Sequence, residues 1–582
     1  MTTIQHAAER ASDHLAEDTA PVRPWLQSYP SDVAWDAPLQ GVPLHSFLDN
    51  AASQFPDRMA TLFLGGSLTY GELGALCDRA AKGLQGLGVK KGDHVGLLLP
   101  NSPTYLVFYY AILKIGGVVV NYNPLYTANE LEYQAKDSQT DLIVTLDLKL
   151  TFDKVDELLT RGSLKRAVVC DFAALLPGLK STLFKLFKSG DRAKPTRSEN
   201  RAKLVFEKDL MANDGTPVVP TIDPDSDLAV IQYTGGTTGK PKGAMLTHAN
   251  LSINVQQLSL WGPHLKDGQE RGFAALPFFH VFAMTTILNF GVAKAAEMVI
   301  MPRFQVDDGL KLIHKTRPTF MPGVPTLYNA IMNHPKLGDY DLTCLDLCIS
   351  GGAPLPLDLK RSFEAKTGCS LVEGYGLSET SPVATCNPLQ GPTKEGSIGQ
   401  PMPGTTIEIR EIGNPEKVLP QGEKGEICIS GPQVMRGYWQ RPDATADTFV
   451  GNALRTGDVG YIDEEGFTFI VDRMKDLIIC SGYNVYPRNI EEAIYEHPDV
   501  EEVTVIGIAD KYRGEAPKAF IKLRGDATMT QDEMISFLSA NLSKIEMPEA
   551  IEFRDELPKT MIGKLSKKEL KEEEAAKAAQ SA

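Results

Sequence analysis

The chain has 582 residues, of which 42% are hydrophobic and 23% are charged, and its formal net charge is −15. This length exceeds what one hydrophobic core accommodates, so we expect two or more domains. The acidic balance argues against a nucleic-acid partner, because the chain has no overall excess of lysine and arginine with which to displace phosphate counterions.

Three further patterns bear on the compartment. The eight cysteines are scattered and contain no C-x-x-C pair, which predicts reduced thiols and no zinc site. The first 21 residues are polar and lack an apolar stretch, so we expect no secretion signal. The longest apolar helix candidate, residues 105–120, is too short and too interrupted by charge and glycine to span a bilayer. A cytoplasmic protein is expected.

The first third of the chain alternates between helical and strand patterns. Apolar residues at helical spacing predict helices at 44–55, 69–87 and 103–115, and short apolar runs predict strands at 95–99, 118–120, 142–146 and 167–170. Strands separated by helices indicate a mostly parallel sheet covered on both faces. Ligands of such sheets bind at the C-terminal ends of the strands.

The segment from Leu175 to Lys194 mixes apolar and basic side chains. They are Leu179, Leu183, Phe184, Leu186 and Phe187, interleaved with Lys180, Lys185 and Lys188. Two interpretations are open: a helix that lies on an anionic membrane surface, or a helix packed on its own domain with the lysines in water. The packed helix is the preferred interpretation, and Pro177 limits the length of any helix here.

A second series of strands and helices follows residue 228. The patterns predict strands at 228–231, 273–276, 319–321 and 345–350, and helices at 249–261, 307–315 and 325–332. The strand at 345–350 leads directly into Gly351, Gly352 and Ala353. Residues 391–437 are rich in glycine and proline and contain alternating segments at 405–409 and 425–430, which predict a small β-rich subdomain.

A separate small α+β domain is expected after residue 473. Its pattern is a strand, a helix at 490–497, strands at 500–507 and 518–523, a helix at 531–542 and a last strand. Residues 567–582 alternate lysine, glutamate and alanine, which predicts a frayed helix or a tail. We place the junction between the domains at Asp472 and Arg473.

The stretch from Tyr233 to Gly243 has the composition of a phosphate-binding loop. Glycines let backbone NH groups turn toward an anion, threonines add hydroxyl donors, and lysines add positive charge. It fails the P-loop pattern, because Thr234 replaces the first glycine and Pro241 replaces the Mg²⁺-binding hydroxyl. As a bare pattern, an ordinary glycine- and threonine-rich surface loop is equally compatible.

The order of residues in this loop resembles the signature loop of the adenylate-forming superfamily, which contains acyl-CoA synthetases, peptide adenylation domains and luciferases. Five further motifs match that family in the same order: Leu276–His280, Gly374–Thr380, Arg455–Asp458, Asp472–Asp476 and Pro558–Lys564. Taken singly, each has a structural alternative, such as a hydrogen-bonded core histidine, a turn tyrosine, an aspartate cap or a solvated lysine. The ordered series outweighs these alternatives.

The resemblance implies a nucleotide site. Its ATP- and AMP-binding residues would be Thr234, Gly235, Gly236, Thr237, Thr238, Gly239, Lys240, Gly351, Gly352, Ala353, Gly374, Tyr375, Gly376, Thr380, Asp458 and Arg473. Within that set, Tyr375 would stack on adenine, Thr380 would contact the phosphate, and Asp458 and Arg473 would contact the ribose. An aromatic face suits a purine.

The resemblance also implies the catalytic parts. Lys564 would be the catalytic lysine, assisted by His280, Thr234 and Glu379, with Thr234 and Glu379 as ligands of Mg²⁺, a hard cation that prefers oxygen. Asp472 would be the hinge. Lys475, Ser481 and Gly482 would form the coenzyme A face, and the acyl-pocket candidates are Phe278, Phe279, Phe282, Met321 and Gly323.

The residues around Ser481 and the absence of space for a carrier module after Lys564 favour a bacterial long-chain type of fatty acid–CoA ligase within this family. Its substrates would be ATP, a medium- to long-chain fatty acid and CoA. An aryl-CoA ligase of the 4-coumarate type, or a non-catalytic fatty acid carrier, is the alternative. The contact of residues 175–194 with the inner face of the membrane, and a homodimer, are left open.

The fold class that follows is α/β. A large domain at 1–471 would contain two mostly parallel sheets flanked by helices and the small β-rich subdomain, and it would bind ATP and the acyl group. A small, mobile α+β domain at 472–582 would carry the hinge, the catalytic lysine and the CoA step.

Overall fold

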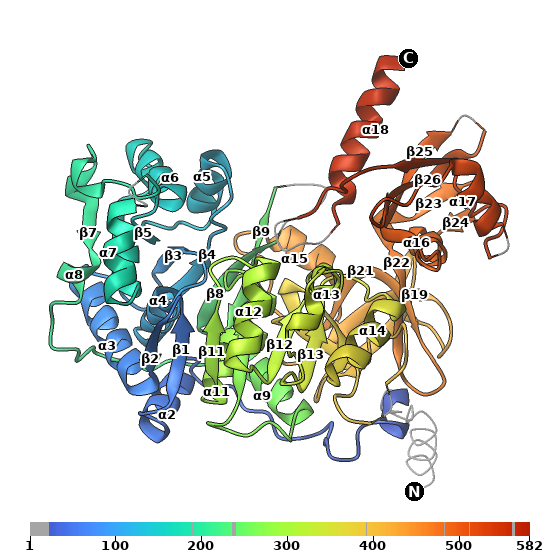
Figure 1. The fold of residues 1–582 in the computed structure, drawn as a ribbon. Coiled ribbons are helices and arrows are strands. Elements are labelled where there is room, and N and C mark those ends of the chain that lie inside the picture. The colour runs from blue at the N-terminus through green and yellow to red at the C-terminus, as the bar shows by residue number, and fades with distance from the viewer. Residues whose placement is uncertain are drawn as a thin grey trace, which may run out of the picture.

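The computed structural model describes residues 23–187, 190–234, 240–391, 393–481, 483–510, 512–539, 541–560 and 565–581. The chain forms four sheets with helices packed around them, and the five-stranded sheet near the C-terminus stands apart from the other three (Figure 1). The α/β class predicted from the sequence is confirmed. Gly235–Gly239, Gly482 and Lys564 lie outside the described residues.

The first large sheet has seven strands, and the phosphate-loop candidate follows a strand at one edge of it. Its order is β7 (Leu204–Phe206), β6 (Arg166–Cys170), β5 (Leu142–Leu146), β3 (His94–Leu98), β4 (Val118–Asn121), β8 (Leu228–Thr234) and β9 (Lys242–Thr247). All neighbours are parallel except β8 and β9, which form an antiparallel pair. Central strands such as β5 are buried along their whole length, because helices cover both faces.

The second large sheet has nine strands. Its order is β16 (Gln400–Pro401), β15 (Val383–Cys386), β14 (Ser370–Gly376), β13 (Leu347–Ser350), β12 (Phe320–Gly323), β10 (Arg271–Ala274), β11 (Glu297–Ile300), β1 (Met59–Phe63) and β2 (Gly66–Thr69). The six strands from β14 to β1 are parallel, and β2, β15 and β16 are antiparallel edges. Both large sheets are therefore mostly parallel, as predicted.

Several of the helices before the five-stranded part begin at capping residues or prolines. They are α2 (Ser46–Gln54), α3 (Tyr70–Gly86), α4 (Pro103–Lys114), α5 (Ala128–Asp137), α6 (Lys149–Thr160), α7 (Gly178–Phe187), α8 (Glu207–Leu210), α9 (His248–Trp261), α10 (Val281–Ala283), η5 (Met284–Asn289, a π-helical turn), α11 (Phe290–Ala293), α12 (Val306–Thr316), α13 (Pro325–Met332), α14 (Leu357–Thr367) and α15 (Pro442–Thr448). Thr69, Thr127 and Thr247 form capping boxes that satisfy the first NH groups of α3, α5 and α9.

Shorter helical turns connect these elements. They are η1 (Pro24–Gln27), η2 (Phe172–Leu175), η3 (Pro195–Arg197), η4 (Arg201–Lys203), η6 (Leu337–Asp339), η7 (Ser378–Thr380) and η8 (Met474–Asp476). The turn η7 carries Glu379 and Thr380, and η8 carries Lys475. These two turns therefore contain residues that the sequence motifs identified.

Helix α4 explains the long apolar stretch at 105–120. Its residues from 103 to 113 are all buried, and the chain then turns into β4. Tyr105 donates to the side chain of Asn121 on β4 at 2.6 Å, and Tyr110 donates to Asn289 of η5 at 3.0 Å. The helix thus lies inside the protein, between the seven-stranded sheet and the π-helical turn. Among the residues described, no helix combines the length and hydrophobicity that a membrane crossing requires.

The two smaller sheets are mostly antiparallel. The six-stranded sheet contains β18 (Asn414–Val418), β17 (Thr406–Glu411), β19 (Gly425–Ser430), β21 (Ala453–Ile462), β20 (Phe449–Val450) and β22 (Thr468–Arg473); the five-stranded sheet contains β24 (Tyr483–Val485), β23 (Ile478–Cys480), β26 (Gly514–Leu523), β25 (Val500–Asp510) and β27 (Ala550–Phe553). Its helices are α16 (Pro487–Tyr495), α17 (Gln531–Leu538) and α18 (Lys567–Ser581).

Two sequence predictions need correction, and the helix expected near residue 567 is better anchored than predicted. The β-rich part extends beyond residue 437, since β20, β21 and β22 complete its sheet. The strand predicted at 273–276 ends at Ala274, because the chain bends there ahead of Pro277. Residues 567–581 form a helix whose first turns are anchored: Leu570 is buried, and Lys571 lies 2.7 Å from Asp476. Sequence alternation alone did not predict this packing.

Buried charges lie where the five-stranded part meets the rest of the chain. The carboxylate of Asp472 accepts the backbone NH of Arg473 at 2.7 Å and that of Arg488, the second residue of α16, at 2.9 Å. Burial raises the pKa of Asp472 to about 6, although nearby Lys567 lowers it. On the facing strand β14, burial raises the pKa of Glu373 to about 7, and the charge of Arg488 opposes this rise.

The raised pKa of Glu373 leads to a pH-dependent contribution to stability. Because its pKa in the folded chain is about 7 and its ordinary value is 4.5, the folded chain binds the proton more tightly. This stabilisation of the folded chain is fully present below the ordinary pKa of 4.5 and is lost as the pH rises through about 7. We expect the unfolding free energy of the wild type, relative to Glu373→Gln, to decrease by on the order of 3 kcal/mol between about pH 5 and about pH 8.

Denaturant unfolding at several pH values measures this difference. Glu395→Gln, which removes a carboxylate from the exposed rim of the same region, is the matched control. A wild type and a Glu373→Gln variant with parallel pH profiles would contradict the prediction.

Candidate active site

The β8–β9 turn places Thr234 and two lysines at the C-terminal end of the seven-stranded sheet. Thr234 ends β8 and Lys242 begins β9, so the predicted loop joins two antiparallel strands. The ammonium group of Lys240 lies 5.3 Å from the ring centre of Tyr133, and that of Lys242 lies 5.0 Å from the ring centre of Tyr438. Both strands contact η7, which brings Thr234 near Glu379.

The carboxylate of Glu379 is oriented by a tyrosine that the sequence motifs do not contain. Tyr438 donates its hydroxyl hydrogen to Glu379 at 2.7 Å, and the backbone NH of Met435 donates to the Glu379 carbonyl at 2.7 Å. The adjacent Thr380 is buried, and its hydroxyl accepts the NH of Leu377 at 2.9 Å. Thr380 therefore shapes the turn that presents Glu379, and its contact with phosphate stays a prediction.

A second cluster brings together three predicted nucleotide residues. Tyr375 at the end of β14 donates to one carboxylate oxygen of Asp458 at 2.6 Å, and the Nε of Arg473 lies 3.1 Å from the other oxygen. Burial raises the pKa of Tyr375 well above its ordinary value, and the negative charge of Asp458 raises it further. The phenol therefore remains a protonated donor. The same carboxylate raises the pKa of Arg473.

The glycine turn after β13 approaches this cluster closely. A Cβ atom at Gly351 would lie 3.1 Å from the ring of Phe282 and 3.4 Å from the carbonyl oxygen of Gly374. Gly352 adopts a φ of +80°, a left-handed conformation that favours glycine. The turn from Gly351 to Ala353 therefore lies beside β14 and Phe282, at the C-terminal ends of neighbouring parallel strands.

The segment that ends in His280 is held by buried polar side chains. Asn101 accepts the NH of Phe278 at 2.7 Å and donates to the carbonyl of Leu276 at 2.8 Å. Gln232 on β8 donates to the carbonyl of Phe279 at 3.1 Å. His280 itself caps α10, since its Nδ1 accepts the NH of Phe282 at 3.3 Å. The His280 segment is thus fixed to the strand that leads into Thr234.

These supporting residues were not predicted from the sequence. Gln232 also accepts from the amide of Asn121 at 3.0 Å, and Asn121 accepts the hydroxyl of Tyr105 at 2.6 Å. Asn121 and Gln232 are amides at the ends of apolar strand segments. A polar residue within a buried run is the signal that could have identified them, because burial requires that such a group be hydrogen bonded.

An apolar pocket lies between α9, η5, β12 and β13, and the space within it, open solvent included, is about 350 Å³. Its walls consist of Leu258, Leu265, Thr286, Phe290, Phe320, Met321, Pro322, Leu347, Ile349 and Leu389. The hydroxyl of Thr286 donates to the carbonyl of Phe282 at 2.7 Å, which leaves its methyl group for an apolar wall. Of the five residues predicted for the acyl pocket, Met321 lines this space.

The other acyl-pocket candidates lie elsewhere. Phe278 is fully buried and packs against the ring of Tyr105 with centroids 5.6 Å apart. A Cβ at Gly323 would lie 2.8 Å from the ring of Tyr328, so this glycine accommodates that tyrosine. Phe279 and Phe282 flank His280. These positions shape the strand ends near His280 rather than the 350 Å³ pocket.

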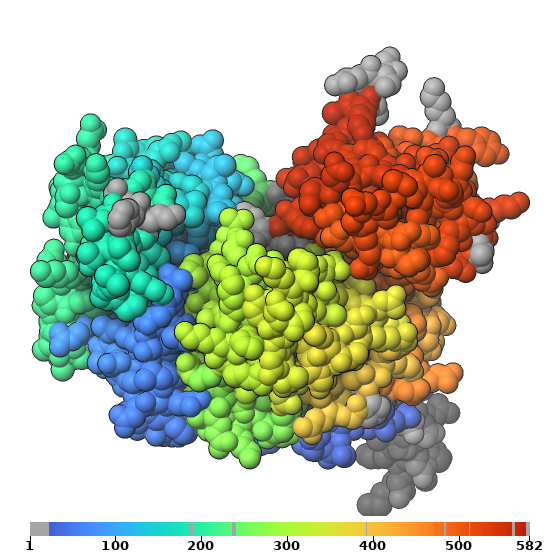
Figure 2. Space-filling model, in the orientation of Figure 1, coloured from blue at the N-terminus to red at the C-terminus, as the bar shows by residue number. Residues whose placement is uncertain are grey.

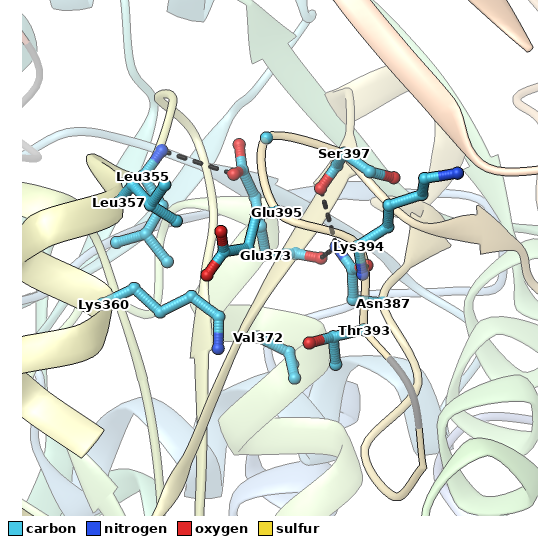
Figure 3. A pocket seen from close by; sticks show the side chains of 11 residues that line it. Leu355, Leu357, Lys360, Val372, Glu373, Asn387, Thr393, Lys394, Glu395 and Ser397 are labelled. Atoms are coloured by element: carbon cyan, nitrogen blue, oxygen red, sulfur yellow. Dashed lines mark hydrogen bonds between the residues drawn. The ribbon is translucent and has the colours of Figure 1, made fainter. Parts of the chain in front are cut away.

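A polar pocket of about 280 Å³ lies beside β14 (Figure 3). Glu373 accepts the NH of Leu355 at 3.4 Å, and Asn387 donates to the carbonyl of Ser397 at 2.6 Å. Lys360 is paired with Glu364 at 2.5 Å. The predicted site residues do not line this pocket, whose charged groups are paired with neighbours in the protein.

Two of the predicted coenzyme A residues, Lys475 and Ser481, lie within the described part of the chain. Lys475 lies on η8, and burial together with the charge of Arg473 lowers its pKa. Ser481 follows β23 and is exposed, with a φ of +52°, and its NH donates to the carbonyl of Arg513 at 2.7 Å. Their contact with coenzyme A stays a prediction.

Comparison with known proteins shows the family of the chain. The AMP-binding enzyme family matches residues 48–439, and the AMP-binding enzyme C-terminal domain matches residues 489–564. A long-chain-fatty-acid–CoA ligase from Bacillus subtilis is 42% identical over 562 residues, which cover 95% of this chain and 98% of that protein. A feruloyl-CoA synthase from Amycolatopsis is 33% identical and covers 89% of this chain and 96% of that protein.

The fold is similar to solved structures as well. The crystal structure of ATP-bound MatB from Rhodopseudomonas palustris matches with a TM-score of 0.78 and 30% identity, covering 91% of this chain and 98% of that chain. The region matched by the AMP-binding enzyme family includes β8 and β14, which carry Thr234 and Tyr375. The chain belongs to the AMP-binding enzyme family.

Proposed function

We propose that this chain is an ATP-dependent fatty acid–CoA ligase that forms AMP. In the first step a fatty acid carboxylate attacks the α-phosphorus of ATP and releases pyrophosphate, and in the second step the CoA thiol displaces AMP from the acyl adenylate. The observation that carries the proposal is the meeting of Tyr375, Asp458 and Arg473 at the end of β14, just before η7, which carries Glu379 and contacts the strand that ends in Thr234. The 42% identity to a long-chain-fatty-acid–CoA ligase supports the substrate class.

The adenosine would lie between the Gly351 turn and Tyr375. Asp458 accepts a hydrogen bond from Tyr375 and forms an ion pair with Arg473, so its carboxylate is held in a fixed orientation. A ribose hydroxyl would donate to this carboxylate, and the aromatic face of Tyr375 would pack on the purine. Because these partners are already in place, little reorganisation is needed when the nucleotide binds.

The triphosphate would lie at the β8–β9 turn. Residues 234–240 would supply backbone NH groups and hydroxyls, and Lys564 would add positive charge from the C-terminal part of the chain. When bound with ATP, Mg²⁺ would neutralise charge on the phosphates. Glu379, with a hydroxyl from Thr234, fits the one or two protein oxygens that Mg²⁺ usually takes beside phosphates. His280 would border the acyl carboxylate.

The two steps would use different orientations of the C-terminal domain, residues 472–582, relative to residues 1–471. Asp472 binds the NH of Arg488 at the start of α16, so a rotation about Asp472 would exchange this contact. We assign Lys564 to the adenylation orientation. In the other orientation, Lys475, Ser481 and Gly482 would face the acyl adenylate and guide CoA to it.

The acyl chain would occupy the 350 Å³ pocket that includes Met321. Its lining is nearly all aliphatic or aromatic, which suits a hydrocarbon chain, and each buried methylene contributes about 0.8 kcal/mol. The adjacent π-helical turn η5 widens the helix beside His280, which is where a substrate would pass from the reacting centre into the pocket.

Two other functions would use parts of the same geometry. An aryl-CoA ligase is favoured by the 33% identity to a feruloyl-CoA synthase. A fatty acid carrier would use the apolar pocket but would not need Asp458, Glu379 and Lys564.

We place the enzyme in the cytoplasm. Contact with the inner face of the membrane through residues 175–194 would give it access to poorly soluble acids. We assign no oligomeric state, and a homodimer is an alternative to a monomer.

Acyl-dependent release of pyrophosphate separates these functions. We expect release that depends on ATP, Mg²⁺ and a fatty acid of medium or long chain, and little with cinnamates. Pyrophosphate release should be measured over a series of acids of increasing length and with ferulate. Preference for ferulate would favour the aryl-CoA ligase, and acid binding without pyrophosphate release would favour the carrier.

The catalytic lysine gives a prediction about the two half-reactions. We expect Lys564→Ala to slow adenylation by roughly 10²–10³-fold, the scale for the loss of one charge-stabilising donor. Thioester formation from supplied acyl-AMP should change much less, because Lys564 would have left the site by then. Single-turnover assays of each half-reaction measure the ratio, with Lys559→Ala of the same motif as the control. Equal losses in both steps would argue against domain rotation.

The buried amide chain gives a prediction about positioning. We expect Gln232→Leu to lower kcat for adenylation by about 10-fold or more, because it removes the hydrogen bond to the Phe279 carbonyl that fixes the His280 segment. The KM for ATP should change less than kcat, since the side chain of Gln232 hydrogen bonds to Asn121 and to the Phe279 carbonyl. Gln232→Glu, which keeps an acceptor toward Asn121, is the comparison variant. Unchanged kcat in both would show that the segment is held without Gln232.

A further inference from the structure

One face of α7 is apolar and exposed to solvent. Leu179, Leu183 and Leu186 are 76%, 42% and 66% exposed, which is unusual for three leucines on one short helix. Their spacing of four and three residues places them on the same side of the helix. The preferred sequence interpretation is a helix packed on its own domain with its lysines in water. It does not account for the exposed leucines.

The opposite face of α7 attaches the helix to the protein. The ring of Phe184 packs against that of Phe172, with centroids 5.0 Å apart, and the hydroxyl of Ser181 donates to the carbonyl of Ala173 at 2.7 Å. At the N-terminal end of α7, Lys180 donates to the carbonyl of Leu64 at 2.9 Å. The helix is therefore held on the body of the protein with its leucines turned outward.

The surroundings of this face are basic in an otherwise acidic chain. Residues 178–203 contain eight lysines and arginines and two acidic residues, whereas the whole chain has a net charge of −15. Lys185 and Lys194 are exposed, and the nearest acid to Lys185, Asp171, lies 3.9 Å away. The region lies on the side of the molecule away from the five-stranded sheet (Figure 2). Local charge therefore favours an anionic partner.

We propose that α7, with its Lys185 and the nearby Lys194, forms a docking surface for a bilayer that contains anionic lipid. An exposed row of leucines fits the acyl region just below the headgroups, and flanking lysines and arginines fit anionic headgroups. Docking would give the protein access to fatty acid held in the membrane, and this role rests on the proposed function. The docking itself does not rest on it.

Vesicle co-sedimentation tests the proposal with the full-length protein. The vesicles are pure phosphatidylcholine, or equal parts phosphatidylcholine and phosphatidylglycerol. We expect the wild type to sediment with the anionic vesicles at low salt. Replacement of Leu179, Leu183 and Leu186 by serine, or of Lys185 and Lys194 by glutamine, should lower the partition coefficient by on the order of tenfold.

Val218→Ser with Val219→Ser is the matched control, because both valines are exposed outside α7 and 178–203. Thermal unfolding verifies that each variant is folded, and pyrophosphate release from a soluble acid verifies activity in the absence of vesicles. The proposal is overturned if the wild type stays in the supernatant, if the leucine variant binds as well as the wild type, or if that variant instead changes the oligomeric state. Loss of vesicle binding with intact pyrophosphate release would support docking independently of the ligase assignment.

Discussion

The buried carboxylate of Asp458 joins the parts of this structure on which the candidate site depends. One of its oxygens accepts a hydrogen bond from Tyr375 on β14, the other forms an ion pair with Arg473 at the end of β22, and Asp458 itself lies on β21. A buried carboxylate is costly unless it is paired and hydrogen bonded. The nine-stranded and six-stranded sheets must therefore meet in one arrangement to satisfy it. Arg473 then leads directly into the hinge candidate and the five-stranded part.

A second constraint joins the two large sheets. The amide of Gln232, at the end of the seven-stranded sheet, binds the carbonyl of Phe279, which follows a strand of the nine-stranded sheet. Asn101 and Tyr105 bind the same segment from the loop and helix after β3. Each of these side chains is buried and would be destabilising if it were left unpaired. The result is that the His280 segment and Thr234 are positioned by one polar network.

The sequence predicted much of the α/β framework, because buried parallel strands are apolar along their whole length and the helices between them retain a regular period. It predicted less where packing overrides local pattern. Residues 567–581 have the alternating charge of a solvated end, yet Lys567 lies 2.8 Å from Glu491 and Leu570 is buried. Tyr438, which orients Glu379, belongs to none of the six motifs, because its role depends on a contact between segments 59 residues apart.

The sequence by itself determined which chemistry is available: the glycines, threonines, carboxylates and lysines of six motifs in a fixed order. Only the tertiary structure decided which of these groups meet, because hydrogen bonds such as that between Tyr375 and Asp458 join residues 83 positions apart. The same holds for α7, whose periodic leucines are compatible with either a packed or an exposed face. Phe184 packs on Phe172 and thereby turns Leu179 and Leu186 to solvent. A periodic pattern defines the faces of a helix, whereas the surface against which the helix packs decides which of them is buried.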